Sequence, residues 1–140
     1  MNINWYPGHM AKTKRLISED LKLVDAVVEV LDARIPISSK NPDIDELCQN
    51  KPKIVLLNKS DMANDLVTDR WVAYYKEQGI SALKVNCETG EGLKRITADL
   101  KELLKEKLLR NEQKGIFKPI RIMVVGIPNS GKSSFINRMA

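Results

Sequence analysis

Short apolar runs rich in β-branched residues alternate along the chain with longer segments in which apolar positions recur at helical spacing. The runs have the length and composition of strands buried in a parallel sheet. We predict strands at residues 24–31, 53–57, 82–85 and 120–125. Strands that alternate with helices indicate an α/β fold, with a mostly parallel sheet and helices on both faces.

Helical spacing is found in three segments, residues 10–22, 66–78 and 91–110. Gly79 directly follows the second segment and is expected to end that helix, because glycine readily takes the left-handed conformation found there. The third segment predicts one long helix. It could serve as a partner-binding coil, but the strands predicted on both sides of it favour packing against the sheet.

Residues 126–133 read GIPNSGKS and fit the phosphate-binding pattern G-x-x-x-x-G-K-[ST]. A predicted strand runs into this segment, and a helical segment leaves it. Gly126 and Gly131 allow the backbone to curl so that successive N–H groups point at an anion. Lys132 is expected to contact the β- and γ-phosphates, and the Ser133 hydroxyl to bind Mg²⁺. The alternative is a simple turn before a helix, and the motif does not separate ATP from GTP.

Asn58, Lys59, Ser60 and Asp61 follow the second predicted strand and match N-K-x-D, the pattern by which GTPases read guanine. The Asp61 carboxylate can accept two hydrogen bonds from guanine, whereas adenine would leave it unsatisfied. The Lys59 stem can lie along the base, and Asn58 can bond the base and tie this loop to the phosphate loop. The carboxyl ends of parallel strands are where ligands bind in such sheets.

Residues 86–93 read NCETGEGL and follow the third predicted strand. They look like the S-A-K-x-G-x-G-L loop that closes over guanine in GTPases, with Asn86 and Cys87 in the places of Ser and Ala. A backbone N–H of that loop contacts the guanine oxygen, so the side chains there matter less. A simple strand-to-helix turn is the alternative interpretation.

The guanine-reading motif precedes the phosphate loop, which reverses the usual order. Together with WYPGHMAK at residues 5–12 and LDARIP at residues 31–36, the motifs resemble the circularly permuted GTPases of the YlqF/YawG family. The resemblance implies a P-loop GTPase domain over residues 1–140, with GTP as substrate and Mg²⁺ as cofactor. It also implies GTP hydrolysis coupled to late assembly of the large ribosomal subunit, through contacts to that subunit or its precursor, its rRNA and its proteins.

One departure from the family pattern concerns the end of the chain. No D-x-x-G segment follows Ser133, and the family's C-terminal helical RNA-binding domain is absent from the 140 residues. We therefore expect residues 1–140 to be the N-terminal part of the domain, incomplete at its C-terminus and insufficient alone for hydrolysis. A nucleotide-dependent RNA-binding module without hydrolysis is the alternative function. An ATP-using P-loop enzyme is a third, which the N-K-x-D motif argues against.

The resemblance carries nucleotide-binding roles onto a set of positions in the three loops. These are Asn58, Lys59, Ser60, Asp61, Asn86, Cys87, Asn129, Ser130, Gly131, Lys132, Ser133, Ser134 and Phe135. His9 matches the histidine proposed to orient the attacking water, with a surface or packing role as the alternative. Asn129 resembles the residue of GTPases that use K⁺, with a turn-favouring role as the alternative.

Two further pairs of residues have structural interpretations. Asp32 and Arg34 end the first predicted strand, and we expect an ion pair that holds the loop rather than catalysis. Trp5 and Tyr6 are expected to anchor the N-terminal segment by packing, with stacking on RNA as the alternative.

Composition adds limits rather than a function. The formal net charge of +5 is compatible with an RNA or ribosome partner and equally with a lysine-rich surface. No apolar run approaches membrane-spanning length and no secretory signal is found, which predicts a cytoplasmic protein. Cys48 and Cys87 lack CxxC spacing and are expected to be free thiols. Zinc is not supported, since His9 is the sole histidine. We do not expect an oligomer.

Overall fold

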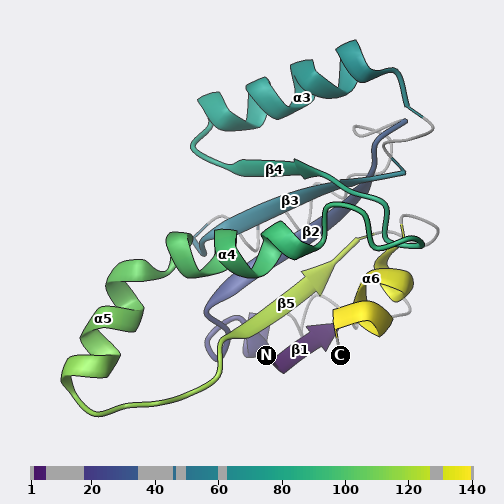
Figure 1. Ribbon diagram of the computed structural model, residues 1–140. Coiled ribbons are helices and arrows are strands. Elements are labelled where there is room, and N and C mark those ends of the chain that lie inside the picture. The colour runs from purple at the N-terminus through teal and green to yellow at the C-terminus, as the bar shows by residue number, and fades with distance from the viewer. Residues whose placement is uncertain are drawn as a thin grey trace.

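The computed structural model describes residues 2–5, 18–34, 46, 50–59, 63–126 and 131–139, and of residues 2–5, 132 and 133 it describes the backbone alone. Five strands in this part of the chain form one sheet in the order β1-β5-β2-β3-β4 (Figure 1). Every pairing in the sheet is parallel. The strands are β1 Asn2–Trp5, β2 Ala26–Asp32, β3 Lys53–Asn58, β4 Ser81–Lys84 and β5 Arg121–Val125.

Four of these strands confirm the predicted ones, with bounds shifted by one or two residues. β1 was not predicted, because its sequence NINW is short and has no apolar run. It pairs with β5 at the edge of the sheet, from Asn2 opposite Arg121 to Trp5 opposite Val124. Its place therefore depends on backbone hydrogen bonds that no side-chain pattern records.

Helices cover both faces of the sheet, as predicted. They are α3 Asp65–Glu77, α4 Lys94–Leu103, α5 Lys105–Gln113 and α6 Lys132–Met139. On one face, Ile96 and Leu100 of α4 and Phe135 of α6 pack against a core that includes Val28 and Leu56. Full burial of a large apolar side chain stabilises a fold by about 1.5–3 kcal/mol, so this cluster is a main source of stability.

The opposite face is covered by α3, whose Tyr75 packs with Leu31, Val55 and Leu57. The helix begins after Asn64, whose side chain accepts hydrogen bonds from the N–H groups of its first turn. Two residues after its last residue, Glu77, Gly79 has φ +75°, and the Ile80 N–H donates to the Tyr75 carbonyl at 2.9 Å. The prediction that Gly79 ends this helix is confirmed.

The prediction of one long helix over residues 91–110 is wrong. The segment breaks at Leu104, where φ is −101° and ψ is 13°, into α4 and α5. α4 packs its apolar face on the sheet, as expected, but none of the α5 residues is buried. The apolar spacing continues through the break, so nothing in the periodicity marks it.

Of the predicted helix at residues 10–22, only residues 18–22 are described, and these are helical at 18–20 and a turn from 21. Among the described helices, none has the length and apolar character needed to cross a membrane. The carboxyl ends of β2 and β3 are level, because Asp32 lies opposite Asn58 in their register. Loops that leave these strands are thus brought to one edge of the sheet.

Candidate functional site

Three loops that are distant in sequence meet at this edge, and the Asn58 side chain joins them. Its Oδ1 accepts a hydrogen bond of 2.8 Å from the Cys87 N–H, in the loop after β4. Its amide end lies against Gly131, the last residue before α6: a Cβ placed on Gly131 would lie 2.9 Å from Asn58 Cγ and closer still to Nδ2. Asn58 is buried, so these contacts are fixed by packing. The expected tie between the N-K-x-D loop and the phosphate loop is thus present.

Gly131 has two reasons to be glycine. Its φ is +102°, a conformation that other residues rarely adopt, and the space a side chain would need is filled by Asn58. α6 begins directly after it, and the N–H groups of a first helical turn have no acceptor within their own helix. Such a helix start following a glycine loop favours binding of an anion.

The first residues of α6 differ in how deeply their side chains are buried. Lys132 and Ser133 form its first turn, and their side chains lie outside the described part of the structure. Ser134 is half-buried, and the Phe135 side chain is fully buried in the core. The Phe135 N–H donates to the Gly131 carbonyl at 3.0 Å. Phe135, predicted among the nucleotide-binding positions, therefore has its side chain in a packing role.

The loop after β4 is a tight turn held by its own residues. Asn86 Oδ1 accepts hydrogen bonds from the N–H groups of Glu88 and Thr89, at 3.0 and 3.1 Å. Gly92 has φ +82°, and a Cβ there would lie 2.6 Å from the Lys84 carbonyl oxygen. The Asn86 side chain is therefore used to shape the loop, which leaves backbone groups as the means by which it can contact a base.

Cys87 and Arg138 connect this loop to α6. The Arg138 Nε donates to the Cys87 carbonyl at 2.7 Å, and its Nη2 donates to the Glu88 carbonyl. The Cys87 thiol is free and buried, and burial raises its pKa to about 11. Cys87 thus fills a small space as an apolar group, in agreement with its match to an Ala position. Sequence reasoning missed Arg138, because no motif includes it.

Asp32 carries an ion pair at the same edge. The Arg34 Nε and Nη2 donate to its two carboxylate oxygens at 3.0 and 2.7 Å. The pKa of Asp32 lies below its ordinary value, mainly because of these hydrogen bonds. The expected ion pair is confirmed. Lys59 Nζ also lies 3.5 Å from Asp32 Oδ2.

Lys59 is the one residue other than glycine with a positive φ, at 60°, in the part of the chain that the structure describes. A long side chain in this conformation costs free energy, on the order of 1–3 kcal/mol, and such strain gathers at functional sites. The ion pair with Asp32 and the burial of neighbouring Asn58 hold Lys59 in this state.

Several predicted positions lie outside the described residues: His9, Ser60, Asp61, Asn129 and Ser130. Cys48, Tyr6 and the Trp5 side chain lie outside them too. The roles assigned to these positions stay predictions.

Comparison with known proteins gives relatives across the whole chain, although no family model matches it. Ribosome biogenesis GTPase A of Priestia megaterium is 58% identical over 142 residues, which cover 100% of this chain and 49% of the relative. Mitochondrial ribosome-associated GTPase 1 of Mus musculus is 41% identical over 136 residues, covering 96% of this chain and 41% of the relative. The chain thus spans about half the length of the curated relatives it matches.

Among solved structures, the crystal structure of GNP-bound YlqF from T. maritima is similar, with 34% sequence identity and a TM-score of 0.63. The match covers 90% of this chain and 46% of that one. A GDP-bound structure of the same protein matches with a TM-score of 0.61. Sequence and fold therefore point to the same group of proteins.

Proposed function

We propose that the protein, which belongs to the YlqF family of circularly permuted GTPases, binds GTP at the edge of the sheet where β2, β3 and β5 end. We propose further that it hydrolyses GTP to GDP and phosphate during assembly of the large ribosomal subunit. The observation that carries the proposal is the contact of Asn58 with both Gly131 and the Cys87 N–H. It joins the loops assigned to the phosphates and to the base.

The phosphate end of the site is assigned to the loop before α6. The N–H groups of the loop and of the first turn of α6 would surround the phosphates, and the Lys132 ammonium would bind the β- and γ-phosphate oxygens. The donor set suits hard cations, since Ser133 offers a hydroxyl oxygen for Mg²⁺ and Asn129 an amide oxygen for K⁺. When bound, these ions would neutralise charge that develops on the phosphates.

The guanine end is assigned to Asp61 and to the loop after β4. A carboxylate that accepts from guanine supplies specificity, because adenine leaves it desolvated and unpaired. The Lys59–Asp32 ion pair would hold the lysine stem over the base. His9, at the N-terminal segment, is assigned the orientation of the attacking water.

A ribosomal partner is proposed from two sources. The relatives are named for ribosome biogenesis and for association with the mitochondrial ribosome. The chain also has a formal net charge of +5, which favours a polyanion. We assign the protein to the cytoplasm, where the buried free thiol of Cys87 suits a reducing environment.

The function is tested by measuring GTP and ATP affinity and phosphate release with the full-length protein. We expect GTP to bind tighter than ATP by on the order of a hundredfold or more. Hydrolysis should rise when purified large ribosomal subunits are added, fall in His9→Ala at unchanged GTP affinity, and fall when Na⁺ replaces K⁺. Equal affinity for the two nucleotides would overturn the assignment to GTP. GTP binding without hydrolysis, with or without subunits, would leave a nucleotide-dependent RNA-binding module.

A further inference from the structure

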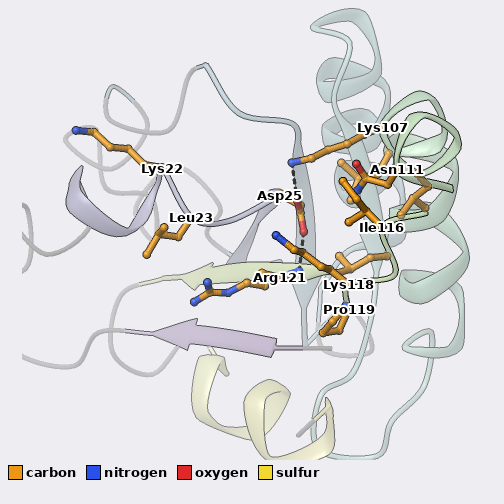
Figure 2. Close-up of a pocket in the computed structure, with 12 residues that line it drawn as sticks. Lys22, Leu23, Asp25, Lys107, Asn111, Ile116, Lys118, Pro119 and Arg121 are labelled. Carbon is orange, nitrogen blue, oxygen red and sulfur yellow. Dashed lines mark hydrogen bonds and ion pairs between the residues drawn. The ribbon is translucent and has the colours of Figure 1, made fainter. Parts of the chain in front are cut away.

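A hollow of about 580 Å³ lies at the edge of the sheet opposite the nucleotide loops, where β2 and β5 begin (Figure 2). Its volume is in the range of ligand clefts, roughly 300–1,000 Å³. α5 and the segment leading to β5 supply apolar wall residues, among them Leu108, Ile116 and Ile120. β2 has seven residues, so about 20 Å of strand separates this hollow from the Asn58 site.

Positive side chains surround a single carboxylate in the hollow. Asp25 accepts hydrogen bonds from Lys107 Nζ at 2.5 Å and from the Arg121 backbone N–H at 2.8 Å. Lys107 is therefore neutralised by its partner. Figure 2 shows the Lys118 and Arg121 side chains extending past Asp25 toward Leu23, whereas the Lys22 ammonium points away. The hollow thus keeps a net positive charge after the one ion pair is counted.

Lys118 and Arg121 have charge to offer a ligand. Among the described residues, neither side chain makes a hydrogen bond or an ion pair, and the Arg121 Nε is buried without an acceptor. A buried N–H donor that has left water without finding a partner destabilises a fold. An anionic oxygen placed between these two side chains would satisfy the donor and both charges.

An exposed aromatic residue directly precedes one of these cations in the chain. Phe117 lies between the lining residues Ile116 and Lys118, and 84% of its surface is exposed. Bases stack on such side chains while nearby cations hold the phosphates, which is how proteins bind single-stranded nucleic acids. An acidic peptide would use the cations but would gain little from an exposed flat ring. The combination favours RNA.

We propose that this basic hollow, formed by Lys107, Lys118 and Arg121 around Asp25, binds single-stranded RNA together with the exposed Phe117, the chain neighbour of Lys118. A backbone phosphate lies between Lys118 and Arg121, and a base stacks on Phe117. The inference rests on the proposed function only for the source of the RNA, which would be the ribosomal subunit. Because the hollow is at the opposite edge from the GTP site, RNA and nucleotide can be bound together.

The test measures binding of the full-length protein to a short fluorescein-labelled RNA of mixed single-stranded sequence, by fluorescence anisotropy at several salt concentrations. Lys118→Glu is compared with Lys76→Glu. Lys76 is an exposed residue of α3, and its replacement changes the net charge by the same amount. Phe117→Ala is compared with Leu66→Ala, an exposed apolar residue of α3. GTP affinity and melting temperature are measured for each variant to establish that the fold is intact.

We expect Lys118→Glu to weaken RNA binding by on the order of tenfold and Lys76→Glu by less than about twofold. Lys118→Gln should lower the slope of log affinity against log salt by about one. Phe117→Ala should weaken binding about fivefold or more, and Leu66→Ala should not. Equal losses in the two charge variants, wild-type binding by Phe117→Ala, or equally strong competition by polyglutamate would each overturn the proposal. RNA affinity is measured without GTP, so a negative result in the GTPase assays does not affect the RNA-binding result. A negative RNA-binding result likewise does not affect the proposed GTPase function.

Discussion

The Arg138 guanidinium donates to the Cys87 carbonyl at 2.7 Å and so links α6 to the loop after β4, although the two residues are 51 positions apart. One helix thereby contacts the loop assigned to guanine and, through the Phe135 N–H, the Gly131 carbonyl at the end of the phosphate motif. Arg138 is a positioning residue in this account, since it acts on a ligand through the backbone of residues 87 and 88.

Arg138→Ala should therefore weaken GTP binding without lowering the strength of phosphate contacts themselves. Hydrogen bonds from a charged group contribute about 1.5–3 kcal/mol, so a loss of on the order of tenfold in GTP affinity is expected. Inorganic triphosphate, which lacks a base, should bind the variant as it binds wild type. Arg110→Ala is the control, because Arg110 is an exposed arginine of α5. A parallel loss of triphosphate binding would show that Arg138 supports α6 and not the base loop.

Replacement of Gly131 by alanine tests the contact with Asn58. Gly115 is the matched control, because its φ is +72° and a Cβ there would meet nothing within 4 Å. Gly115→Ala should lower the free energy of unfolding by about 1 kcal/mol, from backbone strain alone. Gly131→Ala should lower it by about 2–4 kcal/mol and abolish GTP binding, because the methyl group collides with a buried side chain. Chemical denaturation measures both, and equal losses would argue against the contact.

The Asp32–Arg34 pair predicts a particular pH dependence. The pKa of Asp32 is lowered in the folded state, so the ionised carboxylate stabilises the fold above its unfolded value of about 3.8, and this contribution is lost as the pH falls through the lower folded pKa. Asp32→Asn should lower the melting temperature by a few degrees at pH 7, and the difference from wild type should shrink below about pH 4. A difference that is constant between pH 3 and pH 7 would mean that the charge has no part in it.

The Cys87 thiol is expected to be unreactive in the folded protein. Its pKa of about 11 leaves little thiolate at neutral pH, and the side chain is buried. In a Cys48→Ser background, iodoacetamide should label the native protein at least about a hundredfold more slowly than the urea-unfolded protein. Cys87→Ala should keep GTP affinity, whereas Cys87→Leu should reduce it by overpacking beneath the loop. Rapid native labelling would contradict this account of Cys87.

The strands and the loops of the site could be predicted because each leaves a local mark on the sequence. Buried parallel strands such as β2 need β-branched apolar runs, and the turn at Gly131 needs a glycine. The role of Asn58 as a tie between loops follows from its place in N-K-x-D, and the geometry agrees with it.

Other features leave no such mark. The break at Leu104 depends on where the sheet stops supporting the helix, while the apolar spacing runs on unchanged. β1 is placed by backbone pairing with β5, which any polar sequence can make. Arg138 contacts carbonyl groups, which every residue carries, so no residue type at positions 87 and 88 could signal its partner.

The claim on which the account depends is that Asp61 and the phosphate loop hold opposite ends of one GTP. The most direct test is to titrate wild type, Asp61→Asn and Lys132→Ala with GTP and with xanthosine triphosphate. Asn can donate a hydrogen bond to the oxygen that xanthine carries in place of the guanine amine. Asp61→Asn should therefore bind GTP more weakly and xanthosine triphosphate more tightly than wild type, each by on the order of tenfold or more. Lys132→Ala should lose both nucleotides. If Asp61→Asn instead bound GTP as wild type does, the two loops would not share a nucleotide.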